Sequence, residues 1–132
     1  MKFERMKDRC PDSTPQGKGI LKGYKWIINE RGVANILISK PDYVEGYIFS
    51  ITESDERNLD EKEGVKKGCY VKETLTIETD GKSVDCLVYI DPVRDLGKAR
   101  AYYLPLIEQG IIDSELSTKY VNDYIRKFIP DK

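Results

Sequence analysis

The chain has 132 residues, a net charge of −1 and no histidine. This length fits one domain with a single core, and the near-neutral charge without a long basic block excludes a nucleic-acid or polybasic membrane surface. Without histidine, serine–histidine–aspartate and cysteine–histidine catalysis are excluded, so any catalysis must use carboxylates, lysine, tyrosine or backbone amides.

The cysteines and the apolar runs bear on metals, compartment and membranes. Cys10, Cys69 and Cys86 are widely spaced and form no Cys-x-x-Cys pair, so the sequence predicts no metal site. Their odd number, and an N-terminus without a signal-peptide pattern, favour a reducing cytoplasm. No apolar run approaches the roughly 20 residues that a membrane helix needs, so we expect no membrane partner.

The N-terminal segment reads as a short helix, a loop and a strand. Alternating charges predict a helix over Phe3–Arg9, and the Cys10-Pro11 pair would end it because a residue before proline disfavours helical geometry. Turn-forming residues over 12–19 predict a loop. Gly19–Tyr24 then reads as a strand that continues extended through Trp26–Ile28.

Two further strands are predicted in the next segment. Val33–Ile38 and Val44–Ile51 are both rich in β-branched and aromatic residues. Ser39-Lys40-Pro41-Asp42 between them has the composition of a turn. We therefore expect two consecutive strands joined by this turn.

The middle of the chain predicts a helix and a β-hairpin. The segment from Thr52 to Glu63 reads as a short helix that ends at Gly64. Cys69–Glu78 alternates as a half-buried strand does, and Val84–Ile90 follows as a second strand. The Asp-Gly pair between the two strands predicts an antiparallel hairpin.

Two amphipathic helices are predicted at the C-terminal end. Apolar residues recur at helical spacing over Ala99–Ile111 and over Ser117–Ile129. Pro105 fits only in an opening turn, so the first of these helices should begin near Leu104. Together with about five strands, these helices indicate an α+β domain.

The segment Leu59–Tyr70 concentrates acids, two glycines and a tyrosine, and it has two interpretations. Its acids alternate with lysine as a solvated helix face does, with Gly64 as a helix C-cap. Alternatively, one of its carboxylates transfers protons in an active site.

An ordered series of short segments carries a resemblance over essentially the whole chain. They are Glu4–Pro11, Leu21–Tyr24, Gly32–Ile36, Val44–Tyr47, Leu59–Val65, Gly68–Tyr70 and Tyr103–Gly110. The series resembles the γ-glutamylcyclotransferase-like (AIG2-like) family. The resemblance implies an α+β fold with a small mixed, mainly antiparallel barrel-like sheet and short peripheral helices around a cavity.

The resemblance also implies an activity. In this family the α-amine of a γ-glutamyl compound attacks the γ-carbonyl of the same molecule, which yields 5-oxoproline and releases an amine or amino acid. We therefore expect a small γ-glutamyl metabolite as the partner, no metal and no organic cofactor. Nothing in the composition of residues 91–98 selects the leaving group.

The resemblance assigns roles to four side chains. Glu63 stands immediately before the Gly-Val pair and matches the acid/base residue of the family, whereas Asp60 and Glu61 match no functional position and are expected to be solvated. A buried carboxylate could take a proton from the attacking amine and later give it to the leaving amine. Tyr70, Tyr89 and Tyr103 match tyrosines that line the substrate cavity, although core packing would also explain them.

The family pattern begins with a strand and a Tyr-Gly-Ser-Asn loop upstream of the first matching segment, and this chain begins at Met1 after that point. We expect residues 1–132 to form one domain that is truncated at its N-terminus. Three explanations compete: a misassigned or trimmed start, a natural short form without catalysis, or a partner chain that supplies the strand. An unpaired sheet edge would also allow a homo-oligomer.

Three functions remain open on these grounds. The first is a γ-glutamylcyclotransferase-like enzyme, provided that the native gene product contains the upstream loop. The second is a non-catalytic module that uses the same cavity to bind a γ-glutamyl or amino-acid ligand. The third is an interaction domain whose open sheet edge recruits an extended peptide.

Overall fold

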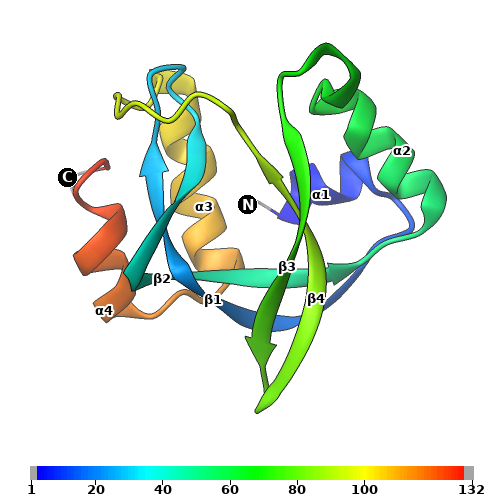
Figure 1. The fold of residues 1–132 in the computed structure, drawn as a ribbon, viewed down its shortest axis with the longest axis horizontal. Helices are drawn as coiled ribbons and strands as arrows, with labels where there is room; N and C mark the ends of the chain where they lie inside the picture. Colours follow the sequence, from blue (N-terminus) through cyan, green and yellow to red (C-terminus); the bar gives the residue numbers. More distant parts are fainter. Residues whose placement is uncertain (1–2, 130–132) are drawn as a thin grey trace.

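The fold is an α+β arrangement, described for residues 3–129 in a computed structural model, in which short helices flank an antiparallel sheet (Figure 1). The elements are α1 (Phe3–Arg9), β1 (Thr14–Ile28), β2 (Ala34–Ser50), α2 (Glu53–Lys62), η1 (Val65–Lys67), β3 (Val71–Thr79), β4 (Lys82–Ile90), η2 (Ala101–Tyr103), α3 (Leu104–Asp113), α4 (Thr118–Tyr120) and η3 (Val121–Ile125). Within this part of the chain the sheet has four strands in the order β2-β1-β3-β4. The predicted fold class is confirmed.

Strands β1 and β2 form a long antiparallel pair that differs from the prediction at its start. The loop predicted over 12–19 is wrong from Thr14 onward, because Thr14 pairs with Ser50 and Lys18 pairs with Tyr47. The ladder satisfies the backbone groups of these turn-forming residues, and a register shift beside Gly17 absorbs the irregularity.

The two strands predicted over 33–38 and 44–51 are one strand, β2, with an unpaired excursion at residues 39–42. Lys22 pairs with Tyr43 and Tyr24 pairs with Ile38, so four residues of β2 stand opposite Gly23 alone. The turn chemistry is present, since the Ser39 hydroxyl donates to the Asp42 carboxylate. A proline is tolerated here because β2 is an edge strand, where its missing N–H breaks no ladder.

The α2 prediction is confirmed at both ends. Thr52 and Asp55 form a capping box, with each side chain accepting from the backbone N–H of the other. Glu63 caps the C-terminal end, and Gly64 follows in the left-handed region with φ 66°. The position of Glu63 is therefore fixed by the end of a helix.

The hairpin prediction is also confirmed. Asp80 and Gly81 have φ values of 48° and 74°, as a two-residue hairpin turn of the mirror-image type requires. The register pairs Thr79 with Lys82 and continues to Val71 with Ile90. This hairpin meets β1 at the pairing of Ile20 with Glu78.

The C-terminal helices depart from the prediction in length. Helix α3 begins at Leu104, as Pro105 indicates, and runs to Asp113. The helix predicted over Ser117–Ile129 is shorter, because α4 passes into the π-helical turn η3, which ends at Ile125. The Ser117 side chain caps α4.

Two apolar clusters of described residues pack the helices against the strands. The first gathers Tyr120, Val121, Ile125 and Ile129 with the partly buried Trp26 and Tyr43. The second gathers Met6, Cys10 and Leu59 with Phe49 and Tyr89. Accordingly, α3 and α4 lie beside β1 and β2, whereas α1 and α2 lie near one end of the β3–β4 hairpin (Figure 1). No helix within residues 3–129 is long and apolar enough to cross a membrane.

Candidate active site

Glu63 is the mostly buried carboxylate where α1 and α2 meet. Its Oε1 accepts a hydrogen bond of 3.1 Å from Nη1 of Arg9, the last residue of α1, and its side chain is 15% exposed. Burial raises the pKa of Glu63 above its ordinary value, and the positive charges of Arg9, Arg5 and Arg31 oppose part of this rise. The carboxylate is therefore suited to exchanging a proton.

Tyr70 lies between Glu63 and the start of β3, after Gly64 and Gly68, which both have left-handed backbone conformations. The guanidinium of Arg31 lies over its ring, 5.5 Å from the ring centroid. Burial raises the pKa of Tyr70 to about 12, and the negative charges of Glu63 and Asp91 add to this rise. The phenol therefore stays neutral at physiological pH and can donate a hydrogen bond.

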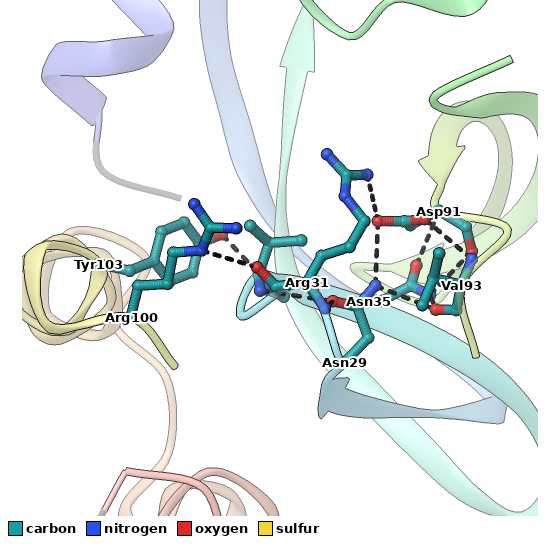
Figure 2. A network of polar contacts seen from close by, with 9 residues as sticks. Asn29, Arg31, Asn35, Asp91, Val93, Arg100 and Tyr103 are labelled. Atoms are coloured by element: carbon teal, nitrogen blue, oxygen red, sulfur yellow. Dashed lines mark hydrogen bonds and ion pairs between the residues drawn. The ribbon is translucent and has the colours of Figure 1, made fainter. Parts of the chain in front are cut away.

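Tyr103 approaches the same group of charges from the C-terminal part of the chain. Its hydroxyl accepts a hydrogen bond of 3.3 Å from the backbone N–H of Ala34 (Figure 2). Burial raises the pKa of Tyr103, and the charges of Arg5, Glu63 and Arg9 also act on it. This side chain thus joins the start of α3 to the start of β2.

Tyr89 lies on β4 with its hydroxyl already bonded. It donates a hydrogen bond of 2.6 Å to Oδ1 of Asp60, whose other oxygen accepts from Lys72 at 3.0 Å. These partners, Tyr89 first, lower the pKa of Asp60. Asp60, expected to be solvated, is 33% exposed and also bonds to two residues of the β3–β4 hairpin.

The four residues predicted as site residues are therefore brought into one neighbourhood. Burial raises the pKa of each tyrosine, and in all three cases the charge of Glu63 contributes to the rise. Glu61, the other acid next to Glu63 in the predicted helix, is exposed.

A buried polar network stands behind Arg31 and was not predicted. The Asp91 carboxylate, with a side chain 0% exposed, accepts from Nη1 of Arg31 at 2.6 Å and from Nδ2 of Asn29 at 3.0 Å. The Asn35 side chain pairs with the backbone of Asp91 in both directions, at 2.9 Å each (Figure 2). The network joins the β1–β2 turn to the end of β4.

Sequence reasoning missed Arg9, Arg31 and Asp91 as members of this site. Arg9 stands within a segment of the family resemblance, which was the available signal. Arg31 lies between two predicted strands, Asp91 follows the strand predicted over Val84–Ile90, and the two residues are 60 positions apart, so no local pattern connects them.

The described residues hold no metal cluster, and an open hollow lies away from Glu63. No group of three or more histidine, cysteine, aspartate or glutamate side chains within residues 3–129 could hold a metal ion. The hollow, of about 410 Å³, lies over β1 and β2. It is lined by Ile20, Lys22, Lys40, Pro41, Asp42, Tyr43 and Glu45.

Comparison with known proteins identifies the family. The sequence profile of the AIG2-like family matches residues 43–124. The chain belongs to the AIG2-like family. This AIG2-like protein is 31% identical over 90 residues to a γ-glutamylcyclotransferase of Homo sapiens, and 39% identical over 59 residues to one of Bos taurus. The human match covers 67% of the chain and 48% of the relative, and the bovine match covers 44% and 31%. The AIG2-like protein thus spans about half the length, or less, of these curated relatives.

Solved structures resemble the AIG2-like protein over nearly all of its length. A γ-glutamyl cyclotransferase structure is 25% identical with a TM-score of 0.86, over 99% of this chain and 83% of that one. YkqA from Bacillus subtilis is also 25% identical, with a TM-score of 0.80 over 98% of this chain and 51% of its own. The fold is therefore of the γ-glutamylcyclotransferase type.

Proposed function

We propose that this AIG2-like protein is a γ-glutamylcyclotransferase-like enzyme in which Glu63 transfers the proton. The observation that carries the proposal is a largely buried carboxylate, held by Arg9 at the end of α2, beside Tyr70. The relatives that share this family and fold bear the name γ-glutamylcyclotransferase. The proposed substrate is a small γ-glutamyl compound.

The reaction removes two protons from the attacking nitrogen. The α-ammonium of the substrate first gives a proton to Glu63, because a protonated amine has no lone pair for attack. The free amine then forms a bond to the γ-carbonyl carbon, and the bond from that carbon to the leaving nitrogen breaks. Glu63 gives this proton to the leaving nitrogen, and the attacking nitrogen loses its second proton as the lactam forms. The products are 5-oxoproline and the leaving amine, which takes up the second proton and departs as an ammonium ion, and no water is consumed.

The environment of Glu63 fits both halves of this cycle. Burial raises its pKa, so the carboxylate is a better base than an exposed glutamate. A positioned proton-transfer group contributes typically about 10²–10⁴-fold to a rate. Arg9 bonds to Oε1, and Oε2 has no hydrogen-bond partner among residues 3–129, so Oε2 is the oxygen that faces the substrate amine.

The three tyrosines would serve different purposes around the substrate. Tyr70 carries a neutral hydroxyl that can donate to the γ-carbonyl oxygen as negative charge develops there. Tyr103 would pack its ring against the glutamyl chain, since its hydroxyl already accepts from Ala34. Tyr89 would contribute its ring alone, because its hydroxyl is bonded to Asp60.

The proposed chemistry uses only this chain's own side chains, without a metal or organic cofactor. Proton transfer and intramolecular attack involve no change of oxidation state. The assay with defined substrates identifies the released amine or amino acid. We place the reaction in the cytoplasm, as the cysteine usage suggests.

The direct test is product formation from defined substrates. The protein, in this form and in the longest form that its gene encodes, would be incubated with γ-glutamylalanine and with γ-glutamylethylamine. Chromatography should detect 5-oxoproline and the released amine in equal amounts. Absence of 5-oxoproline from both forms would contradict the proposal. A ligand-dependent rise in thermal stability without product would favour the binding module instead.

A further inference from the structure

Arg31 is held more firmly than a surface arginine needs to be. Its backbone N–H donates to Oδ1 of Asn29 at 3.1 Å, and its carbonyl oxygen accepts from Nε of Arg100 at 3.0 Å. Gly32 follows with φ 80°, and a Cβ there would meet Cγ of Arg100 at 2.7 Å. The turn that carries Arg31 is therefore held by hydrogen bonds on both sides, and a side chain at position 32 would be strained.

The guanidinium is fixed from one side and open on the other. Only Nη1 meets Asp91, and Figure 2 shows the second terminal nitrogen pointing away from that carboxylate. The side chain is 42% exposed, and Nη2 and Nε have no hydrogen-bond partner among residues 3–129. An arginine fixed in this way presents a planar set of donors that suits a carboxylate.

Arg31 belongs to a group of three arginines near Glu63. The positive charges of Arg5, Arg9 and Arg31 all act on this carboxylate. A carboxylate of the substrate that enters beside Tyr70 would be attracted by these charges.

We propose that Arg31, anchored by buried Asp91, binds a carboxylate of the substrate beside Tyr70. This inference rests on the proposed function and names a binding residue for it. A γ-glutamyl compound has a carboxylate on its glutamyl part, and a second one when the leaving group is an amino acid. Arg31 would bind one of the two, and the guanidinium would hold that end of the substrate while Glu63 acts on its amine.

A purely structural role for Arg31 makes a different prediction. Asp91 is buried and needs a counter-charge, so a structural Arg31 would contribute to stability and would not touch a ligand. In that case substitution would lower the melting temperature but leave ligand dissociation constants unchanged. A binding role changes the dissociation constants in the folded variant.

The experiment measures ligand binding without turnover. Titration calorimetry would be done on the Glu63→Gln variant with γ-glutamylalanine and with γ-glutamylalaninamide, whose leaving group lacks the carboxylate. Arg31→Gln and Arg31→Lys would be compared in this background with Arg57→Gln, which removes an exposed arginine on α2. Circular dichroism would establish that each variant is folded, and if Arg31→Gln fails to fold, Arg31→Lys serves in its place.

If Arg31 binds a carboxylate, Arg31→Gln should weaken the binding of γ-glutamylalanine about 10–100-fold. Arg31→Lys should weaken it less, because lysine keeps the positive charge but lacks the planar pair of donors. An equal loss of affinity for both ligands would show that Arg31 binds the carboxylate of the glutamyl part. A loss of affinity confined to γ-glutamylalanine would show that Arg31 binds the carboxylate of the leaving amino acid.

Two outcomes would overturn the inference. One is that Arg31→Gln binds both ligands with dissociation constants within about twofold of those of Arg57→Gln. The other is no detectable binding of either ligand before Arg31 is changed. Failure of the proposed function looks different: without 5-oxoproline from the unsubstituted protein, an effect of Arg31 on binding would still support the carboxylate site.

Discussion

Nη1 of Arg9 lies 3.1 Å from Oε1 of Glu63, and this contact joins the last residue of α1 to the residue that caps α2. The two residues are 54 positions apart in the sequence. Burial favours the neutral form of Glu63, whereas the charge of Arg9 favours the ionised form. The state of the proposed base at neutral pH depends on the balance between them.

Removal of the Arg9 charge should therefore move the pH dependence of the reaction. Arg9→Gln takes away the largest influence that lowers the pKa of Glu63, so this pKa should rise further. A general base works in its ionised form, so the acidic limb of kcat/KM against pH should shift to higher pH. Arg57→Gln is the control, and a limb that stays in place or moves to lower pH would contradict this account.

The same pKa predicts how stability depends on pH. Because the folded pKa of Glu63 lies above its ordinary value of 4.5, its contribution to stability is fully present below pH 4.5 and is lost as the pH rises through the folded pKa. Glu63→Gln cannot ionise, so its free energy of unfolding relative to the parent should increase between pH 4 and pH 7. Urea denaturation at several pH values measures this difference. Glu61→Gln, at an exposed position, should show a flat difference.

Local chemistry made part of this structure predictable. The Asp80-Gly81 turn and the Thr52 cap depend on neighbouring residues alone, and both are present. The turn predicted over residues 39–42 has its hydrogen bond between Ser39 and Asp42. The segments before and after it both pair with β1, however, so the two predicted strands form one strand. Pairing with a distant strand overrides a local turn signal, and a single sequence does not show that pairing.

The site was predictable only where the family resemblance reached it. Glu63 follows from its place before the Gly-Val pair, whereas composition and spacing left it as one acid among several. Asp91 became visible only in the structure, because two of the three groups that donate to its carboxylate, on Asn29 and Arg31, lie in the distant turn between β1 and β2. Long-range polar networks leave no periodic signal in a sequence.

The Asp91 network should contribute measurably to stability. Asp91→Ala would leave the Arg31 cation and the N–H of Val93 without their buried acceptor. We expect a loss of about 2–4 kcal/mol in the free energy of unfolding, less than for a fully buried ion pair because Arg31 is partly exposed. Denaturant unfolding measures it, with the exposed Asp95→Ala as the control, expected within about 0.5 kcal/mol of the parent. Equal stability of the two variants would contradict the prediction.

The Tyr89–Asp60 hydrogen bond should matter for stability more than for substrate. Tyr89→Phe removes a bond of 2.6 Å to a partly exposed carboxylate, so we expect a loss of about 1 kcal/mol and little change in KM. Tyr47→Phe, whose ring packs against Phe49, is the matched control. A large rise in KM without loss of stability would show that the Tyr89 hydroxyl binds substrate.

The central claim is that Glu63 transfers the proton, and turnover of γ-glutamylalanine by matched glutamate variants tests it most directly. Glu63→Gln should lower kcat for 5-oxoproline release by about 10²–10⁴-fold while the protein stays folded, whereas Glu61→Gln, on the exposed side of the same helix, should keep the parent rate. If folded Glu63→Gln forms 5-oxoproline as fast as Glu61→Gln, Glu63 is not the proton-transfer group.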